Sequence, residues 1–237
     1  HDNVQVGPGA LVLGRTTIGE GTQVSPYATV GAPPQDLKYK GQKTFIEIGN
    51  NNNFREYVTV NCGTVEGGGK TRIGNNAHIM AYSHIAHDCL VHDGAIIANS
   101  GTLGGHVEIG ERAILGGLVG IHQFVRVGKL AMIAACSKAT QDVIPFSAVF
   151  GSPARLYGLN SVGLKRAGIA SEVQKELKRA FHLLFEEALS REEALKEIQK
   201  NCGESSEAKE LVAFIEGAKR GICRRVQHLT EEPSWSD

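Results

Sequence analysis

The chain has 237 residues, and its 25 basic and 25 acidic side chains give a formal net charge of zero. A chain of this length forms one large domain or two small ones. Because it has no net positive charge and only 6% aromatic residues, it does not resemble a nucleic-acid-binding protein or one held to anionic membranes by charge.

The cysteines are scattered and odd in number: Cys62, Cys89, Cys136, Cys202 and Cys223. Without a CxxC pair they predict neither a disulfide framework nor a zinc knuckle, and they favour a reducing compartment. No apolar segment is long enough to span a bilayer, and no signal peptide is visible. We therefore expect a cytoplasmic protein without stable membrane insertion.

A six-residue repeat of aliphatic residues starts close to the N-terminus, at Val6, Val12, Ile18, Val24 and Val30. Since the chain begins at His1 with the repeat already running, we expect N-terminal coils to be missing from it. The repeat breaks at 31–44, resumes at Ile48, Phe54 and Val60, and breaks again at 61–72. Prolines, polar residues and a run of three glycines predict that both breaks bulge out as loops, which often carry binding residues.

Between residues 73 and 137 the repeat is uninterrupted, with aliphatic residues at Ile73, Ile79, Ile85, Val91, Ile97, Leu103, Ile109, Leu115, Ile121, Val127 and Ile133. A helix would repeat at three and four residues and an ordinary strand at two. A six-residue period instead predicts a parallel β-helix in which three hexapeptides make one 18-residue coil. Coils stack at about 4.8 Å, so residues 18 apart should lie above one another.

The repeat fades after Ser137, and the composition changes beyond residues 151–153. A helix starting near Ser171 is predicted from the spacing of Val173, Leu177, Phe181, Leu184 and Ala188. Ser190 and Glu193 form a capping box that predicts a second helix, and a third is predicted around Leu211, Val212, Phe214, Ile215 and Ala218. We predict a β-helix domain over residues 1–152, capped by a small α-helical C-terminal domain over 153–237.

Polar residues interrupt the aliphatic wall most densely at residues 83–89, SHIAHDC. With the 18-residue spacing they form a candidate cluster of His84, His87, Asp88, His106, His122 and Gln123, with Gly105 beside His87. Three interpretations are open. The histidines could be incidental residues at a hydrated corner, or they could bind a metal, because imidazole is a common zinc ligand. Alternatively, His87 could be a general base for a sugar hydroxyl, with Asp88 fixing its tautomer and the Gly105 amide facing an oxyanion.

Further segments occur in order along the chain: QDLKY (35–39), SHIAHDC (83–89), LGGHV (103–107), IHQF (121–124), QDV (141–143) and GLNSVGLKR (158–166). Over residues 6–166 the chain resembles the acyl-carrier-protein–UDP-N-acetylglucosamine O-acyltransferases, whose reaction opens lipid A biosynthesis. The resemblance implies a left-handed β-helix and a homotrimer with active sites between subunits. It also implies that no metal or other cofactor takes part.

The resemblance further implies a role for each candidate residue. His87 would remove the proton of the 3-hydroxyl of UDP-N-acetylglucosamine, which attacks the thioester of a 3-hydroxyacyl-acyl carrier protein. Asp88 would orient His87, and the Gly105 amide would stabilise the oxyanion. Binding of the nucleotide sugar or acyl chain would fall to Asp36, Lys38, His84, His106, His122, Gln123, Asn160 and Arg166. Ala135 stands where side-chain size limits acyl length, which predicts a donor of medium length.

Acyl carrier protein is acidic, so a basic landing surface is expected at Lys165, Arg166, Lys175, Lys178 and Arg179. An ordinary solvated helix face is the alternative for these residues. Other functions also stay open: a related N-acyltransferase with a 3-amino sugar acceptor, a metal-dependent enzyme like the hexapeptide-repeat carbonic anhydrases, and a non-catalytic scaffold.

Overall fold

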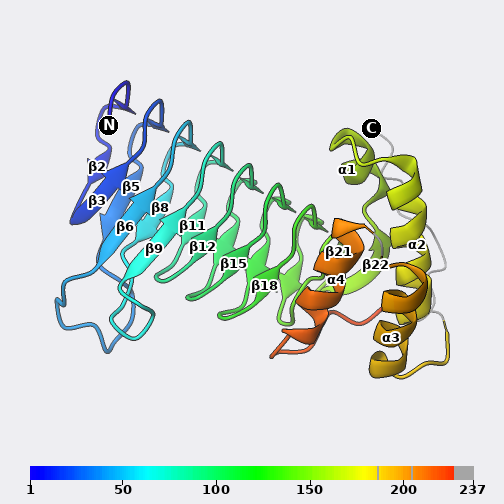
Figure 1. Cartoon of the computed structure of the whole chain (residues 1–237). Coiled ribbons are helices and arrows are strands. Elements are labelled where there is room, and N and C mark those ends of the chain that lie inside the picture. The colour runs from blue at the N-terminus through cyan, green and yellow to red at the C-terminus, as the bar shows by residue number, and fades with distance from the viewer. Residues whose placement is uncertain (186, 204, 227–237) are drawn as a thin grey trace.

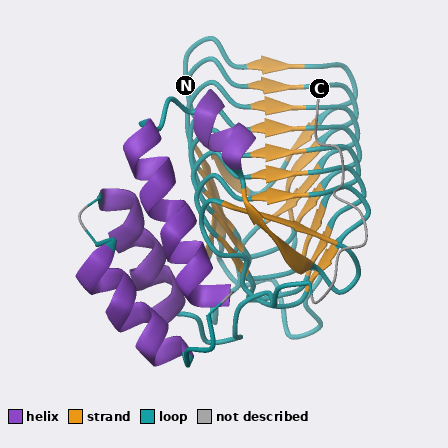
Figure 2. Cartoon of the chain, turned by 90° about the vertical axis from the view of Figure 1, so that its right-hand side faces the viewer, coloured by secondary structure: helices purple, strands orange, loops and turns teal. Residues whose placement is uncertain are grey.

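The hexapeptide repeats form short strands that wind around a triangular prism, and the helices lie at its C-terminal end (Figures 1 and 2). The computed structural model describes residues 1–185, 187–203 and 205–226. Successive strands go in turn to three sheets, and strands of neighbouring coils pair in parallel. The architecture is the predicted left-handed parallel β-helix with a helical cap.

We call the three sheets faces A, B and C. Face A consists of β1 (Gln5–Val6), β4 (Gln23–Val24), β7 (Asn53–Phe54), β10 (His78–Ile79), β13 (Ile96–Ile97), β16 (Ile114–Leu115), β19 (Met132–Ile133), β21 (Ser147–Phe150) and β22 (Arg155–Leu159). Face B consists of β2 (Leu11–Val12), β5 (Thr29–Ala32), β8 (Thr59–Asn61), β11 (His84–Ile85), β14 (Thr102–Leu103), β17 (Gly120–Ile121) and β20 (Lys138–Ala139). Face C consists of β3 (Arg15–Ile18), β6 (Phe45–Ile48), β9 (Lys70–Ile73), β12 (Leu90–Val91), β15 (Glu108–Ile109) and β18 (Arg126–Val127).

The strand register confirms the 18-residue spacing in the uninterrupted part of the repeat. Ile85 of β11 pairs with Leu103 of β14, which pairs in turn with Ile121 of β17. From Ile73 to Ile133 the repeated aliphatic residue is at most 4% exposed, so these side chains fill the prism. The first coil differs, because Val6 and Val12 are 53% and 43% exposed.

The turns between faces form three edges, which we call AB, BC and CA. Each edge places residues in the left-handed backbone conformation, for example Tyr82 at edge AB (φ 64°), Asp88 at edge BC (φ 60°) and Asn76 at edge CA (φ 56°). Both insertions lie at edge BC, since they connect β5 to β6 and β8 to β9. The second is shorter than predicted, because β9 already pairs with β6 from Lys70 onward.

The helical cap contains α1 (Ser161–Arg166), α2 (Ser171–Phe185), α3 (Arg191–Asn201) and α4 (Ser206–Glu216). The predicted start of α2 at Ser171 and the capping box of Ser190 and Glu193 are both confirmed. Ala188 and Ala218 lie beyond the ends of α2 and α4, so both helices are shorter than predicted. Among the described residues, no helix has the length and apolar character required to cross a bilayer.

The cap is joined to the prism by more than one segment. Strand β22, the last strand of face A, pairs antiparallel with its neighbour β21. After α4 the chain returns, and Ile222 and Arg225 form parallel bridges with Asp142 and Leu156. Since β22 and the returning segment both continue the prism, the division at 152/153 stays a prediction.

Candidate active site

Edge BC gathers most of the residues that the sequence singled out. His87, Asp88, Gly105, His106, His122 and Gln123 lie on its turns, and Asp36 and Lys38 lie on its first insertion. The backbone keeps the turns in vertical register, because the amide of His106 donates to the carbonyl of His87 and that of Phe124 to the carbonyl of Gly105. The predicted position of Gly105 one coil away from His87 is thus observed.

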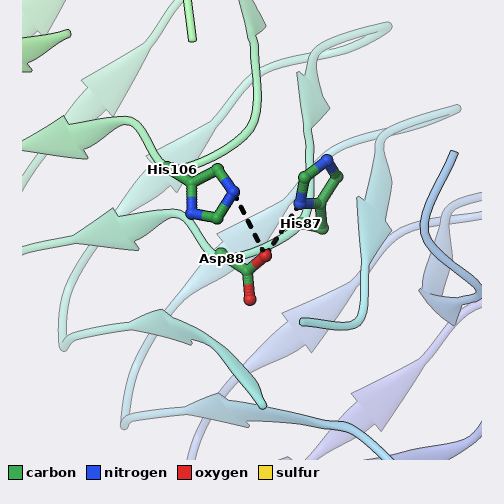
Figure 3. A group of neighbouring side chains, drawn as sticks. All are labelled: His87, Asp88 and His106. Carbon is green, nitrogen blue, oxygen red and sulfur yellow. Dashed lines mark hydrogen bonds and ion pairs between the residues drawn. The ribbon is translucent and has the colours of Figure 1, made fainter. Parts of the chain in front are cut away.

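His87 and Asp88 form a hydrogen-bonded pair at this edge (Figure 3). The Nδ1 atom of His87 lies 2.8 Å from Oδ2 of Asp88. The Asp88 side chain is 1% exposed, whereas His87 is 16% exposed and reaches the surface. With Nδ1 donating to the buried carboxylate, Nε2 is left as the basic atom, which is the tautomer that a general base requires.

The carboxylate of Asp88 has partners that the sequence did not reveal. The backbone amide of Thr64 donates to Oδ1 at 2.7 Å, and the Thr64 hydroxyl donates to Oδ2 at 2.6 Å. Thr64 belongs to the second insertion, whose length breaks the 18-residue spacing. The spacing therefore does not predict that Thr64 lies next to Asp88. The only signal in the sequence was that this insertion lies at the same edge as the cluster.

Gly105 presents its backbone to the imidazole of His87. A Cβ atom added at Gly105 would lie 2.5 Å from Cε1 and 2.7 Å from Nε2 of that ring. Only glycine therefore leaves His87 its position. Within the described part of the chain the Gly105 amide has no hydrogen-bond partner, so it is free to donate to a bound oxygen beside Nε2.

His106 extends the pair along the edge. Its Nε2 lies 3.6 Å from Oδ2 of Asp88, and its ring stacks on Phe124 with centroids 4.4 Å apart. Burial lowers the pKa of His106, with His87 acting in the same direction, while the carboxylates of Asp88 and Asp36 oppose the shift. Asp36, on the first insertion, is therefore near enough to act on this site.

The remaining polar residues of the cluster are less directly involved in this pair. His84 lies on face B, where its Nδ1 is 2.7 Å from the Thr59 hydroxyl, and burial, followed by the nearby His87, lowers its pKa. His122 and Gln123 are exposed, and Nδ1 of His122 lies 3.0 Å from the Gln123 carbonyl. They lie in the turn between β17 and β18, one coil further along edge BC than Gly105.

Three of the predicted residues lie elsewhere on the prism. Ala135 is exposed at edge AB. Asn160 caps α1 by accepting from the amide of Gly163, and its side chain donates to the Leu130 carbonyl. With Arg166 it lines a cavity of about 600 Å³ between α1 and face A, whose other walls are mostly apolar. Face A is the side of the triangle opposite edge BC, so one chain does not bring these residues to His87.

His87, Asp88 and His106 each offer a ligand atom within 4.8 Å of the others, which is the one candidate metal group in the described ranges. Two imidazoles and a carboxylate are suitable ligands for zinc. However, both oxygens of Asp88 already accept hydrogen bonds from protein donors, and Nδ1 of His87 is used in one of them. A metal ion would therefore compete with these donors for the oxygens of Asp88.

Comparisons with known proteins agree with this fold. The family model for bacterial transferase hexapeptide repeats (six repeats) matches residues 70–105, and the model described as UDP N-acetylglucosamine O-acyltransferase, domain 2, matches residues 142–223. The first match and the prism define the class of hexapeptide-repeat transferases.

Two curated relatives narrow this class, both named acyl-[acyl-carrier-protein]–UDP-N-acetylglucosamine O-acyltransferase. That of Anaeromyxobacter sp. (strain Fw109-5) is 46% identical over 213 residues, covering 90% of this chain and 83% of the relative. That of Thermodesulfovibrio yellowstonii is 48% identical over 229 residues, covering 94% and 89%. The chain belongs to the acyl-[acyl-carrier-protein]–UDP-N-acetylglucosamine O-acyltransferase family.

Solved structures agree with that assignment. The UDP-N-acetylglucosamine acyltransferase of Bacteroides fragilis 9343 matches with a TM-score of 0.92 at 36% identity, covering 94% of this chain and 87% of that one. The corresponding enzyme of Campylobacter jejuni matches with a TM-score of 0.85 at 40% identity, covering 95% and 94%. The prism and its cap are therefore shared with solved UDP-N-acetylglucosamine acyltransferases.

Proposed function

We propose that the protein transfers a 3-hydroxyacyl group from acyl carrier protein to the 3-hydroxyl of UDP-N-acetylglucosamine, the first step of lipid A biosynthesis. Relatives at 46% and 48% identity carry the name of this activity. The observation that carries the proposal is the buried Asp88 bound to His87, with the bare Gly105 backbone against the same ring.

The geometry suits a general-base mechanism. Nε2 of His87 takes the proton of the sugar hydroxyl as its oxygen attacks the thioester carbonyl. Asp88, bound to Nδ1, stabilises the resulting imidazolium, and the free Gly105 amide donates to the tetrahedral oxyanion. When the intermediate collapses, the C–S bond breaks and His87 returns the proton to the leaving thiol. The thioester supplies the activation, so no cofactor takes part.

The complete site requires a second copy of the chain. His87 lies at edge BC, whereas Ala135 lies at edge AB and Arg166 lines the cavity on face A. If face A and edge AB of one subunit pack against edge BC of the next, both sets face the same cleft. Such a head-to-tail contact closes a ring when the rotation between neighbouring subunits is a whole fraction of a turn, and we propose a homotrimer. The other predicted binding residues, including Asp36, Lys38, His84, His106, His122, Gln123 and Asn160, would then line or flank the clefts between subunits.

Exposed apolar residues on edge AB support this contact. Tyr27, Tyr57 and Tyr82 stack in a ladder with centroids 5.4 and 5.0 Å apart, and all three are at least 46% exposed. Leu118 continues the edge at 65% exposure. Such a row of large apolar side chains is typical of an interaction surface.

Two further features belong to the proposal. Lys165, Arg166, Lys175, Lys178 and Arg179 are exposed on α1 and α2, where acidic acyl carrier protein could dock. Such a carrier is a cytoplasmic protein, so we propose that the enzyme works in the cytoplasm.

The activity is tested by incubating the protein with UDP-N-acetylglucosamine, or with its 3-amino analogue, and a panel of 3-hydroxyacyl carrier proteins, followed by mass analysis of the products. An ester of the 3-hydroxyl is expected, and His87→Ala should lower kcat by at least about 10²-fold. No transfer by the wild type would indicate a non-catalytic scaffold, and unchanged transfer by His87→Ala would overturn the role of His87 as the base. Exclusive reaction of the amine would indicate an N-acyltransferase, and activity that requires a metal found by elemental analysis would indicate a metalloenzyme.

The assembly is tested by mixing two inactive variants. His87→Ala and Arg166→Ala subunits, refolded together, should recover roughly a quarter of the wild-type activity if each site takes one residue from each of two subunits. If both residues act within one chain, the mixture gains no activity over the separate variants.

A further inference from the structure

The second insertion at edge BC holds the carboxylate of the candidate catalytic pair. Thr64 alone gives Asp88 two hydrogen bonds, one from its amide to Oδ1 at 2.7 Å and one from its hydroxyl to Oδ2 at 2.6 Å. Both oxygens of the carboxylate are thus fixed by one residue, which sets the plane of the group. Oδ2 is also the oxygen that binds Nδ1 of His87.

The direction of the Thr64 hydroxyl is itself determined by the loop. The amide of Gly67 donates to Oγ1 of Thr64 at 3.1 Å, so that oxygen acts as an acceptor toward Gly67. Its own hydrogen is then available for Asp88, which accepts it. A continuous chain of hydrogen bonds runs from Gly67 through Thr64 and Asp88 to His87.

Packing leaves the carboxylate no alternative position. A Cβ atom at Gly67 would overlap the carboxyl group of Asp88, so the loop backbone lies directly against it. On the other side the amide of Asp88 donates to the Thr71 hydroxyl at 2.9 Å, which fixes its backbone. At 1% exposure the Asp88 side chain has almost no access to water that could replace a lost donor.

We propose that Thr64 is a positioning residue of the acyltransferase, acting on His87 through Asp88. The inference rests on the proposed function, and it makes the second insertion part of the catalytic apparatus. The Thr64 hydroxyl holds Oδ2 in the orientation in which it receives Nδ1–H of His87, which keeps Nε2 directed at the acceptor hydroxyl beside Gly105. Thr64 is only 2% exposed, so it acts on the reaction through Asp88 without reaching either substrate.

The test compares Thr64→Val, which has nearly the same shape but lacks the hydroxyl, with Thr64→Ser, which keeps it. Loss of a hydrogen bond to a charged group is expected to lower kcat by about 10- to 100-fold in Thr64→Val. The KM for the nucleotide sugar should change little, because Thr64 does not contact it. Thr64→Ser should stay within about threefold of the wild-type kcat, since its hydroxyl can still donate.

Thr22→Val is a matched control at edge CA. Thr22 is fully buried, and its hydroxyl donates to the Gly49 carbonyl and accepts from the Asn52 amide, far from His87 along the prism. It should lower the melting temperature without changing kcat. If Thr64→Val fails to fold, Thr64→Ala replaces it in the same comparison.

A spectroscopic measurement separates this inference from the proposed function. The Nδ1 proton of His87, bound to a carboxylate, should give a downfield proton resonance in the wild type and in Thr64→Ser, and this signal should shift or broaden in Thr64→Val. Absence of any acyl transfer by the wild type would overturn the function alone. An unchanged resonance, an unchanged kcat in Thr64→Val, or equal losses in the valine and serine variants would overturn the role of Thr64.

Discussion

Edges BC and CA of the prism use the same backbone turn for different purposes. At edge CA, side chains bind the backbone of the neighbouring coil: Asn50 accepts from the amide of Glu20, Asn75 from that of Asn50, and Asp93 from that of Asn75. At edge BC, the carboxylate of Asp88 binds a histidine of its own turn and a threonine of an inserted loop. One edge thus ties coils together, and the other directs side chains at the surface.

Because the edges share this backbone turn, positive φ angles do not locate the functional site in this fold. Positive φ angles in residues other than glycine often mark function. Here they recur at all three edges, as at Tyr82, Asp88 and Asn76, so they belong to the coil geometry. What distinguishes edge BC is a buried charge with several partners. Variants at edge CA should therefore lose stability, and variants at edge BC should lose catalysis.

The largest effect is expected on stability at edge CA. Asn52 is buried, and its side chain donates to the carbonyls of Gly49 and Gly74 and accepts from the amide of Ala77. Asn52→Ala leaves the Gly74 carbonyl and the Ala77 amide without this partner, while Gly49 keeps the hydrogen bond from Thr22. The free energy of unfolding should therefore fall by about 2–4 kcal/mol. Urea unfolding measures this, and kcat at a temperature where the variant is folded should stay unchanged.

The neighbouring residue supplies the control for that variant. The buried side-chain oxygen of Asn53 has no hydrogen-bond partner in the described residues. Asn53→Ala should therefore lose much less stability than Asn52→Ala. Equal losses in the two variants would mean that the side-chain hydrogen bonds of edge CA do not hold the coils together.

A catalytic effect without a stability effect is expected at edge BC. In Gly105→Ala the new methyl group meets the ring of His87, so either the ring or the backbone must move. Displacing a base by this much should lower kcat by about 10- to 100-fold. Gly120→Ala, whose Cβ meets nothing within 4 Å, is the matched control. A fully active Gly105→Ala enzyme would contradict the prediction that His87 needs a residue without a side chain at this turn.

Edge AB is expected to set donor length. Ala135→Gly removes an exposed methyl group where the acyl chain is predicted to end. Relative to the wild type, turnover of a donor two methylenes longer should rise by up to about tenfold. Competition between donors of different length, read by mass spectrometry, measures the ratio. Preference of the wild type for the longest donors would contradict the prediction of a medium-length chain.

The smallest effect is expected at an ion pair on face C. Nε2 of His92 lies 3.1 Å from Oε1 of Glu108, a contact that raises the pKa of His92 and lowers that of Glu108. The contribution of His92 is complete below its unfolded pKa of about 6.5 and is lost as the pH rises through the raised value. That of Glu108 is present above about 4.5 and is lost as the pH falls through the lowered value.

The pair therefore stabilises the fold mainly between about pH 4.5 and 6.5. Since both side chains are about 40% exposed, His92→Gln should lower the free energy of unfolding by at most about 0.5 kcal/mol near pH 5.5 and by nothing measurable near pH 9. Urea unfolding at the two values of pH tests this. A larger loss at the higher pH would contradict the assignment.

The 18-residue spacing of the coils predicted much of the fold and part of the site. The core residues of the coils and the position of Gly105 beside His87 follow from the 18-residue spacing, because strand register in a stacked coil is fixed by the repeat. The same counting separates Ala135 from His87, since the two are not at equivalent positions of a coil. That distinction was available in the sequence, and the proposal of a site between two chains rests on it.

The features that the sequence did not predict lie outside the six-residue repeat. Thr64 reaches Asp88 through an insertion whose length is unrelated to the repeat, so no sequence spacing relates the two. Helix α1 has six residues, too few for a helical pattern of apolar residues, and its cap, Asn160, was noticed only as a binding residue. Strand β22 runs antiparallel, which a repeat of parallel strands does not predict.

The antiparallel strand β22 has a consequence for how molecules meet end to end. A stack of parallel strands always leaves unpaired amides and carbonyls on its last coil, and another chain could add to them. Here β22 and the segment around Ile222 pair with that coil, and the helices lie over it (Figure 1). Extension into a fibre is thus blocked at the C-terminal end, which leaves lateral contacts as the route to assembly there.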